Sequence, residues 1–197
     1  MEKQIVVGRV LRAGSRTFAV GCRVLQEDIP AFGALVRAPA LPGDVYGLIY
    51  DVTVQDDLLT RRLVLADPPQ EVIRDLRENR LIPIEVSVLA VGCRSGDAIR
   101  HGIPPQPPVA LDALYQCPPE EVAAFTRQFG YFRLILDTPG IPADALLVAS
   151  LRLAAQARPP EDRAAFLVEA GREVARLLAR DLVRVEGILR QLSEAAR

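Results

Sequence analysis

The sequence predicts an α+β protein, with a small antiparallel β-barrel followed by a helical domain that ends in a long amphipathic helix. Up to about residue 116, short runs rich in β-branched residues alternate with turn residues. These runs do not alternate with helices, as the strands of a parallel sheet would. Beyond residue 116, Ala, Leu, Glu and Arg dominate, which is typical of helices. We therefore expect a barrel domain over residues 1–116 and a helical domain over residues 117–197.

The barrel strands are expected where apolar, β-branched residues form short runs bounded by Gly, Pro, Asp or Ser. These runs are Ile5–Leu11, Thr17–Val24, Ala34–Ala38, Val45–Val54 and Ile84–Gly92, with a shorter one at Leu63–Leu65. Gly47, inside the fourth run, predicts a bulge or bend. Asp67 followed by two prolines predicts the start of one inserted short helix, Gln70–Asn79.

A proline-rich segment is expected to lead out of the barrel. Its prolines, Pro104, Pro105, Pro107 and Pro108, favour an extended polyproline path. The segment is interpreted as a stiff connector that lies along the barrel. Its PxxP spacing also fits a ligand of an SH3-type domain, so this second interpretation stays open.

Three helices are expected in the second half of the chain. The first begins at Pro118, with two glutamates in its first turn, and runs to about Gln128. The second covers Pro142–Ala157. Between them, Phe129–Leu136 fits a strand or a helix equally well, because eight mostly apolar residues have no decisive period.

The third helix is expected to run without a break from Glu161 to Ala195, since no proline interrupts it. It carries an apolar stripe at near-heptad spacing, which needs a partner to bury it. The helix over 142–157, a second copy of the chain, or both can supply that partner. The stripe consists of Leu167, Gly171, Val174, Leu178, Leu182, Val185, Leu189 and Leu192.

Four arginines recur at every fourth position of the same helix: Arg172, Arg176, Arg180 and Arg184. This spacing stacks them on one helix face, where they could bind an anion or an acidic partner. Acidic residues lie among them, so a solvated face of mixed charge is the alternative interpretation.

Basic residues also predominate near the N-terminus, at Lys3, Arg9, Arg12, Arg16 and Arg23. On a small barrel they could form a nucleic-acid-binding face. Such faces usually interleave aromatic residues that stack on bases, and Phe18 is the only aromatic residue nearby. The net charge of −1 also argues against binding through bulk positive charge. Nucleic-acid binding is therefore kept as the alternative function.

The residue counts exclude several kinds of chemistry. The chain of 197 residues contains one lysine, Lys3, and one histidine, His101. A P-loop needs a lysine within its GxxxxGK[ST] motif, and zinc sites of the HExxH type need two histidines. We expect no catalytic residue, metal or cofactor, although an enzyme built from Arg, Asp and backbone groups remains a further alternative.

The other candidate ligands receive structural interpretations. His101 is expected on the surface, and Asp51, Asp56 and Asp57 in an acidic turn that lacks the EF-hand spacing. The three cysteines are odd in number and widely spaced, which indicates reduced thiols in a cytoplasmic protein: Cys22, Cys93 and Cys117. No signal peptide or membrane-spanning segment is expected.

The first half resembles the HerA/ATP-synthase barrel family. The resemblance rests on a GxV first strand, an aromatic strand, a P-x-x-G-x-x-V turn and strand, and a YG pair that opens the next strand. These features correspond to Gly8, Phe18, Pro30, Gly33, Val36, Tyr46 and Gly47. The resemblance covers residues 5–110 and implies that Gly33 and Gly47 permit tight turns, while Val36, Leu48 and Val88 fill the barrel.

In that family the barrel packs side by side into a ring collar and docks partners. The ATPase domain that follows it there is replaced here by about 80 residues without lysine. The resemblance therefore implies a non-enzymatic assembly or adaptor module. It would self-associate or dock on a protein partner such as a DNA-translocating ring ATPase.

Overall fold

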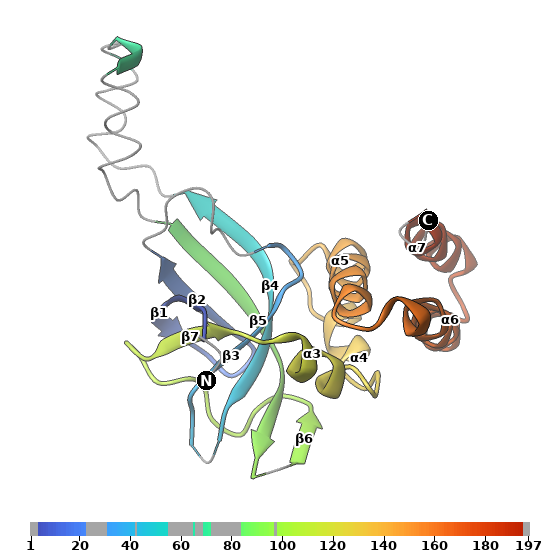
Figure 1. Ribbon diagram of the computed structural model, residues 1–197, viewed down its shortest axis with the longest axis horizontal. Coiled ribbons are helices and arrows are strands. Elements are labelled where there is room, and N and C mark those ends of the chain that lie inside the picture. The colour runs from blue at the N-terminus through green and yellow to red at the C-terminus, as the bar shows by residue number, and fades with distance from the viewer. Residues whose placement is uncertain are drawn as a thin grey trace.

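The computed structural model describes residues 4–22, 31–41, 43–54, 65, 69–71, 84–96 and 98–194. Within this part, the chain forms a closed six-stranded antiparallel β-barrel with five helices packed on one side of it (Figure 1). The prediction of an α+β protein with a small antiparallel barrel is confirmed.

The barrel strands follow the order β2-β1-β7-β3-β4-β5, and β2 pairs with β5 to close the ring. A further strand, β6, extends the sheet beyond β5 as a hairpin. The strands are β1 (Val6–Ala13), β2 (Thr17–Cys22), β3 (Leu35–Ala38), β4 (Val45–Val54), β5 (Ile84–Ser95), β6 (Ala98–His101) and β7 (Ala113–Gln116).

The five longer runs expected from the sequence correspond to β1 to β5. The register of β4 against β5 shifts between Tyr46 and Gly47, so the expected bulge at Gly47 is confirmed. The expected strand at Leu63–Leu65 and most of the expected helix at Gln70–Asn79 lie outside the described residues.

Alternate residues of β3, β4 and β5 enter two separate apolar clusters, because both faces of these strands are buried. One set, including Val36, Ile49 and Val88, points into the barrel. The other set, including Leu35 and Leu48, packs against the helices. Val36 and Val88 thus fill the barrel as expected, whereas Leu48 does not: it faces outward.

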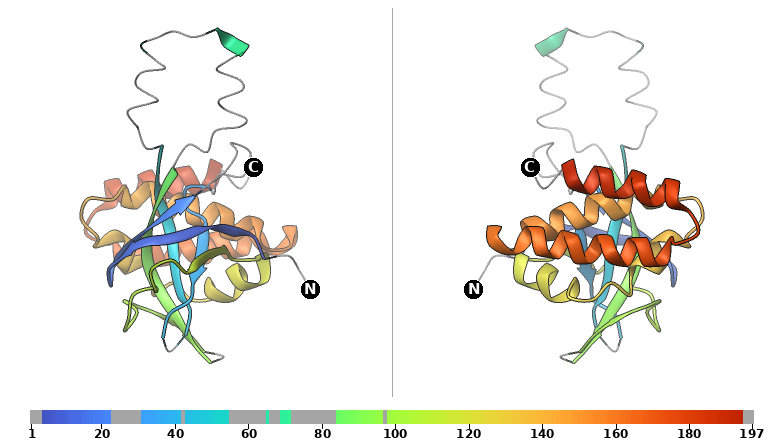
Figure 2. Two further views of the ribbon diagram at one scale, coloured as in Figure 1. Left: turned by 90° about the vertical axis from the view of Figure 1, so that its left-hand side faces the viewer. Right: turned by 90° about the vertical axis from the view of Figure 1, so that its right-hand side faces the viewer.

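The helices form two layers beside the barrel (Figures 1 and 2). The inner layer contacts the strands and the outer layer packs on α5. The inner helices are α3 (Pro119–Phe125), α4 (Phe132–Leu136) and α5 (Ala143–Gln156), and the outer ones are α6 (Pro160–Leu177) and α7 (Leu182–Glu194). Residues 132–136, which the sequence left ambiguous, are therefore helical.

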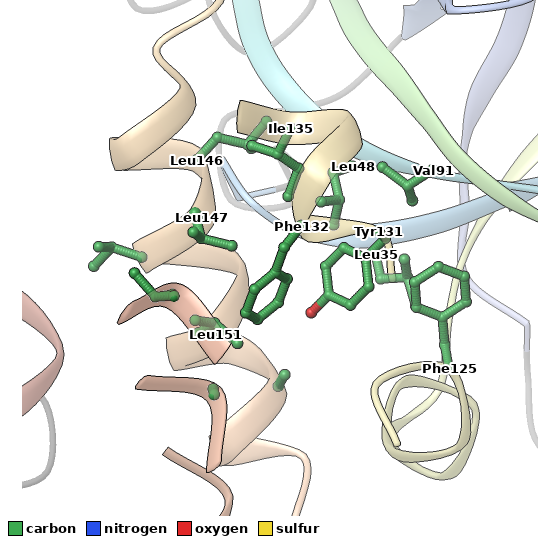
Figure 3. Packing of buried hydrophobic residues seen from close by; sticks show 14 of the residues in the cluster. Leu35, Leu48, Val91, Phe125, Tyr131, Phe132, Ile135, Leu146, Leu147 and Leu151 are labelled. Carbon is green, nitrogen blue, oxygen red and sulfur yellow. The ribbon is translucent and has the colours of Figure 1, made fainter. Parts of the chain in front are cut away.

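The aromatic and aliphatic residues of the inner helices form one continuous cluster with the outer face of the barrel (Figure 3). Phe125, Tyr131 and Phe132 lie beside Leu35 on the strands, and Leu151 of α5 lies beyond them. The barrel and the helices thus share a hydrophobic core.

The expected single helix over residues 161–195 is wrong, because the chain turns back between α6 and α7. Leu178 leaves helical geometry, with φ −104° and ψ 27°. Asp181 then caps α7: its carboxylate accepts a hydrogen bond from the Arg184 N–H at 3.1 Å. The reversal lets Val185, Ile188 and Leu192 bury against the other helices, whereas a straight helix would carry them away from the molecule.

The proline-rich segment lies against the barrel as expected, but the prediction that it leads out of the barrel is wrong, because it joins β6 to β7. Pro104 and Pro108 are buried, and the Val109 N–H donates to the Pro39 carbonyl at 3.5 Å. The segment then leads into β7, which inserts between β1 and β3.

Candidate functional site

A groove runs between α6 and α7 on the outer helix layer, with a volume of about 450 Å³. Among the described residues that line it, only Arg172 and Ser193 have polar side chains. The others are Ala164, Leu167, Val168, Gly171, Ala175, Leu189 and Leu192. Gly171 allows the helices to approach closely, since a Cβ there would lie 2.9 Å from a methyl carbon of Leu189.

Several large apolar side chains of this helix pair remain exposed. Val168 is 53% exposed and Leu189 is 37% exposed, and both line the groove. At the start of α7, Leu182 and Val183 are 74% and 83% exposed. Exposed charges of both signs occur on each helix: Glu169 and Arg172 on α6, Arg190 and Glu194 on α7.

The structure divides the predicted apolar stripe into two parts. Val174, Val185 and Leu192 are buried in the helix packing, so they are core residues. Leu167 and Leu178 are half-buried, and Leu182 and Leu189 are exposed. Leu167, Leu189 and Leu192 together line the groove, where Gly171 forms part of the wall.

The four arginines expected on one helix face do not share one, because the chain reverses among them. Arg176 on α6 binds Glu173, its neighbour at i−3, and lowers the pKa of that carboxyl. Arg180 lies in the turn, and Arg184 on α7 binds Asp144 of α5, with Nε–O distances of 2.7 and 2.9 Å. Arg172 alone lines the groove, so no common anion site is formed.

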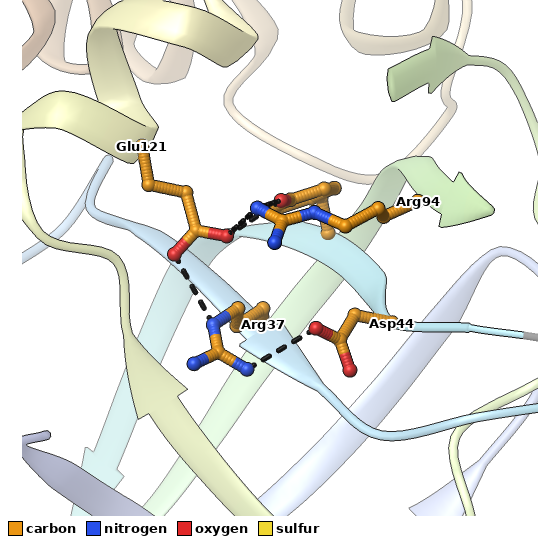
Figure 4. A network of polar contacts seen from close by, with 5 residues as sticks. Arg37, Asp44, Arg94 and Glu121 are labelled. Atoms are coloured by element: carbon orange, nitrogen blue, oxygen red, sulfur yellow. Dashed lines mark hydrogen bonds and ion pairs between the residues drawn. The ribbon is translucent and has the colours of Figure 1, made fainter. Parts of the chain in front are cut away.

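A partly buried polar network joins α3 to the barrel (Figure 4). The Glu121 carboxylate accepts hydrogen bonds from Arg37 Nε at 3.1 Å, from the Tyr46 hydroxyl at 2.6 Å and from Arg94. Arg37 also binds Asp44 at 3.1 Å. The glutamate thus ties together β3, β4, β5 and α3.

Two side chains in and beside this network, Tyr46 and Cys117, have raised pKa values. The pKa of Tyr46 is raised, first by burial and then by its hydrogen bond to Glu121. Burial also raises the pKa of the Cys117 thiol, which keeps it protonated and unreactive. Sequence reasoning missed Glu121, Arg37 and Arg94, because they are far apart along the chain and meet only when the barrel closes.

His101 is half-buried rather than fully exposed as expected: it ends β6, and its side chain packs against the inner helices. Its ring packs against Phe125 and Tyr131, with centroid distances of 4.6 and 5.2 Å. Nε2 lies 3.0 Å from the Phe125 carbonyl oxygen, so the neutral ring donates its proton there. Burial lowers the pKa of His101 below its usual 6.5.

The residues on which the family resemblance rests lie mainly in the strands and turns of the barrel. Phe18 and Val36 point into the barrel, and Gly8 sits where a Cβ would collide with the Gly21 carbonyl. Gly33 has φ +86° in the turn before β3, and Gly47 forms the bulge in β4. Tyr46 belongs to the Glu121 network rather than to the barrel interior, and Pro30 lies outside the described residues.

The N-terminal arginines that the structure describes partly bind the protein itself. Arg12 forms an ion pair with Glu85, and Arg9 Nη1 donates to the Leu111 carbonyl at 2.9 Å. Arg16 is exposed, while Lys3 and Arg23 lie outside the described residues. These contacts reduce the charge available for phosphates.

The remaining candidate ligands form no metal site in the part of the chain that the structure describes. Asp51 accepts hydrogen bonds from the Val52 N–H and the Thr53 hydroxyl, and Asp56 and Asp57 lie outside that part. Cys22, Cys93 and Cys117 are all unpaired. Among the described helices, none combines the length and apolar character needed to cross a bilayer.

No family model matches the chain, and no curated protein matches it.

Proposed function

We propose that this protein is a non-enzymatic assembly module that associates with a second copy of itself through the groove between α6 and α7. The groove is the observation that carries the proposal. Seven of its nine described lining residues are apolar, and Val168 and Leu189 remain exposed within it. Exposed apolar grooves of this kind are stabilised when another protein covers them.

A second copy suits this surface because the same helix pair supplies both a groove and apolar side chains that can enter it. A two-fold contact brings one patch onto its own duplicate, so the patch has to be self-complementary. The charges satisfy this condition, since each helix carries both signs, with Glu169 and Arg172 on α6 and Arg190 and Glu194 on α7. A uniformly acidic or basic partner would face side chains of its own charge on both helices.

The alternative partner, a DNA-translocating ring ATPase, is suggested only by the barrel and its short motifs. The alternative function, nucleic-acid binding, loses support because Arg9 and Arg12 make contacts within the chain. The groove therefore favours self-association over both.

The test compares two valines of the outer layer. Val168→Asp places a charge in the groove, and Val183→Asp is a matched control that is exposed and does not line it. Both side chains are more than half exposed, so both variants are expected to fold, which circular dichroism checks.

Light scattering should give the wild type and Val183→Asp a mass of twice the 21.5 kDa chain at tens of micromolar, and Val168→Asp the mass of one chain. A monomeric wild type, or a Val168→Asp variant that keeps the dimer mass, would contradict the proposal.

A further inference from the structure

A second cavity, remote from the α6–α7 groove, lies between the barrel and the inner helices. Its volume is about 270 Å³, which is room for about nine water-sized groups at ~30 Å³ each. The walls come from the turn before β3 and the start of that strand, from β4, from the end of β7, from α3 with the residues that follow it, and from α5. Two glutamines, Gln116 and Gln156, also line it. Its apolar lining includes Leu35, Leu48, Val122, Phe125, Leu153 and Ala154.

Tyr131 places an unsatisfied hydroxyl at this cavity. Its side chain is 1% exposed and lines the cavity, and Figure 3 shows its hydroxyl directed towards α5. Its oxygen has no hydrogen-bond partner among the described residues. A buried hydroxyl without a partner is costly, so a group that enters the cavity and bonds to it is stabilised.

The other hydroxyls in the wall are already engaged. Thr126 donates to the Val122 carbonyl at 2.7 Å and accepts from Arg158 at 2.7 Å. Ser150 donates to the Leu147 carbonyl at 2.9 Å. Tyr131 is therefore the hydroxyl of the wall that stays available for a ligand.

The cavity selects against charged ligands. No Asp, Glu, Lys, Arg or His occurs among the described residues that line it. Arg158 donates hydrogen bonds to Thr126 and to the Ala154 carbonyl at the wall. A cation would therefore meet a like charge, and an anion would lose its hydration and have to compete with these hydrogen bonds for Arg158. Burial also raises the pKa of Tyr131, so its hydroxyl remains protonated at neutral pH and can donate to an acceptor.

The backbone around the cavity is fixed by close packing. Gly33 has φ +86°, and a Cβ at this position would lie 2.7 Å from the Ala149 Cβ and 2.8 Å from the Ser150 nitrogen. The turn before β3 thus rests directly on α5. A wall held in this way gives a preformed cavity, as small-molecule sites usually have.

We propose that this cavity binds a small neutral molecule, mainly apolar, with one hydrogen-bond acceptor that receives the Tyr131 hydroxyl proton. An aryl ketone of about nine non-hydrogen atoms meets these conditions of size, charge and polarity. Phe125 and Tyr131 provide aromatic surface for its ring.

The experiment uses acetophenone as the probe and titration calorimetry or ligand-observed NMR as the measurement. Ethylbenzene serves as the probe without an acceptor, and benzoate as the charged probe. Three variants are compared with the wild type: Tyr131→Phe removes the donor, Ala157→Leu fills the cavity, and Tyr115→Phe is a control for the loss of a tyrosine hydroxyl outside the cavity.

Acetophenone should bind the wild type and Tyr115→Phe equally, about fivefold to tenfold more weakly to Tyr131→Phe, and not measurably to Ala157→Leu. Ethylbenzene should bind the wild type and Tyr131→Phe alike, and benzoate should bind the wild type more weakly than acetophenone does. No acetophenone binding at millimolar concentration, or equal binding to the wild type and Tyr131→Phe, would overturn the proposal. A loss of fold in Ala157→Leu leaves the comparison with Tyr131→Phe decisive.

Discussion

Replacing Glu121 by glutamine should weaken the attachment of α3 to the barrel. The substitution keeps the size of the side chain and removes the negative charge that Arg37 and Arg94 share. It also replaces one carboxylate oxygen by an amide nitrogen, which cannot accept the hydrogen bonds that this oxygen accepts in the wild type. The Arg37 and Arg94 guanidinium groups then lose the carboxylate that they share. Among the described residues, the acidic side chain that remains beside them is Asp44, which binds Arg37.

The magnitude follows from the burial of the three groups. Breaking a buried ion pair by removing one partner costs about 3–5 kcal/mol. The Glu121 and Arg37 side chains are only 9% and 15% exposed, whereas Arg94 is 37% exposed and can recover part of its hydration. We expect the free energy of unfolding to fall by about 3 kcal/mol. With a urea dependence of about 2 kcal/mol/M, the midpoint should fall by about 1.5 M.

The assay is urea unfolding followed by circular dichroism at pH 7. Glu120→Gln is the matched control, because Glu120 precedes Glu121 in the first turn of α3 and is exposed. It should cost only the interaction with the helix dipole, about 0.3–1 kcal/mol. If Glu121→Gln lowers the free energy of unfolding no more than Glu120→Gln, the network does not hold α3 to the barrel.

Three further predictions concern the stability of the fold. First, the free energy of unfolding should fall as the pH drops below about 6.5, because the unfolded chain binds a proton at His101 more readily than the folded one. In His101→Gln, the urea midpoint should depend less on pH between pH 5 and 7. An unchanged pH dependence would show that His101 is not the group responsible. Second, Asp181→Ala removes the cap of α7 and should lower the melting temperature through a loss of about 1 kcal/mol, whereas Asp162→Ala, in the first turn of α6, should cost less; equal losses would speak against capping. Third, Gly33→Ala should destabilise the protein by at least about 1–3 kcal/mol in thermal unfolding, because φ is +86° and α5 blocks the added carbon. Gly140 has a similar φ of +78° but open space around it, so Gly140→Ala should show the cost of backbone strain without the collision.

Local patterns were sufficient to predict much of the fold. The runs that became β1 to β5 have strand composition along their whole length, and Gly47 marked the bulge in β4. The prolines at positions 119 and 160 lie at the starts of α3 and α6, where a missing N–H costs nothing.

The features that sequence reasoning missed depend on contacts between distant segments. β6 and β7 have only four residues each, and they become strands because β5 and the pair β1 and β3 supply their hydrogen-bond partners. The break before α7 has one local signal, Asp181, which reads equally well as a charged residue on a continuous helix. Its capping role is set by the packing of α7 on α5.

Contacts between distant segments also explain why the candidate sites could be predicted only in part. The spacing of the apolar stripe placed Leu167, Leu189 and Leu192 on one face, and the structure brings these three to the groove. The spacing could not show that α7 folds back, which removes Arg180 and Arg184 from the face of Arg172. His101, alone in a loop-like sequence, gave no sign of the aromatic residues that surround it.

The most direct test of the account is hydroxyl-radical footprinting of the wild-type chain at increasing protein concentration. Labelling of Val168 and Leu189 should fall as a second copy covers the groove, while Val183 on the same helix pair should keep its labelling as an internal reference. Constant labelling of all three residues across the range, or protection of Val183 alone, would contradict self-association through α6 and α7.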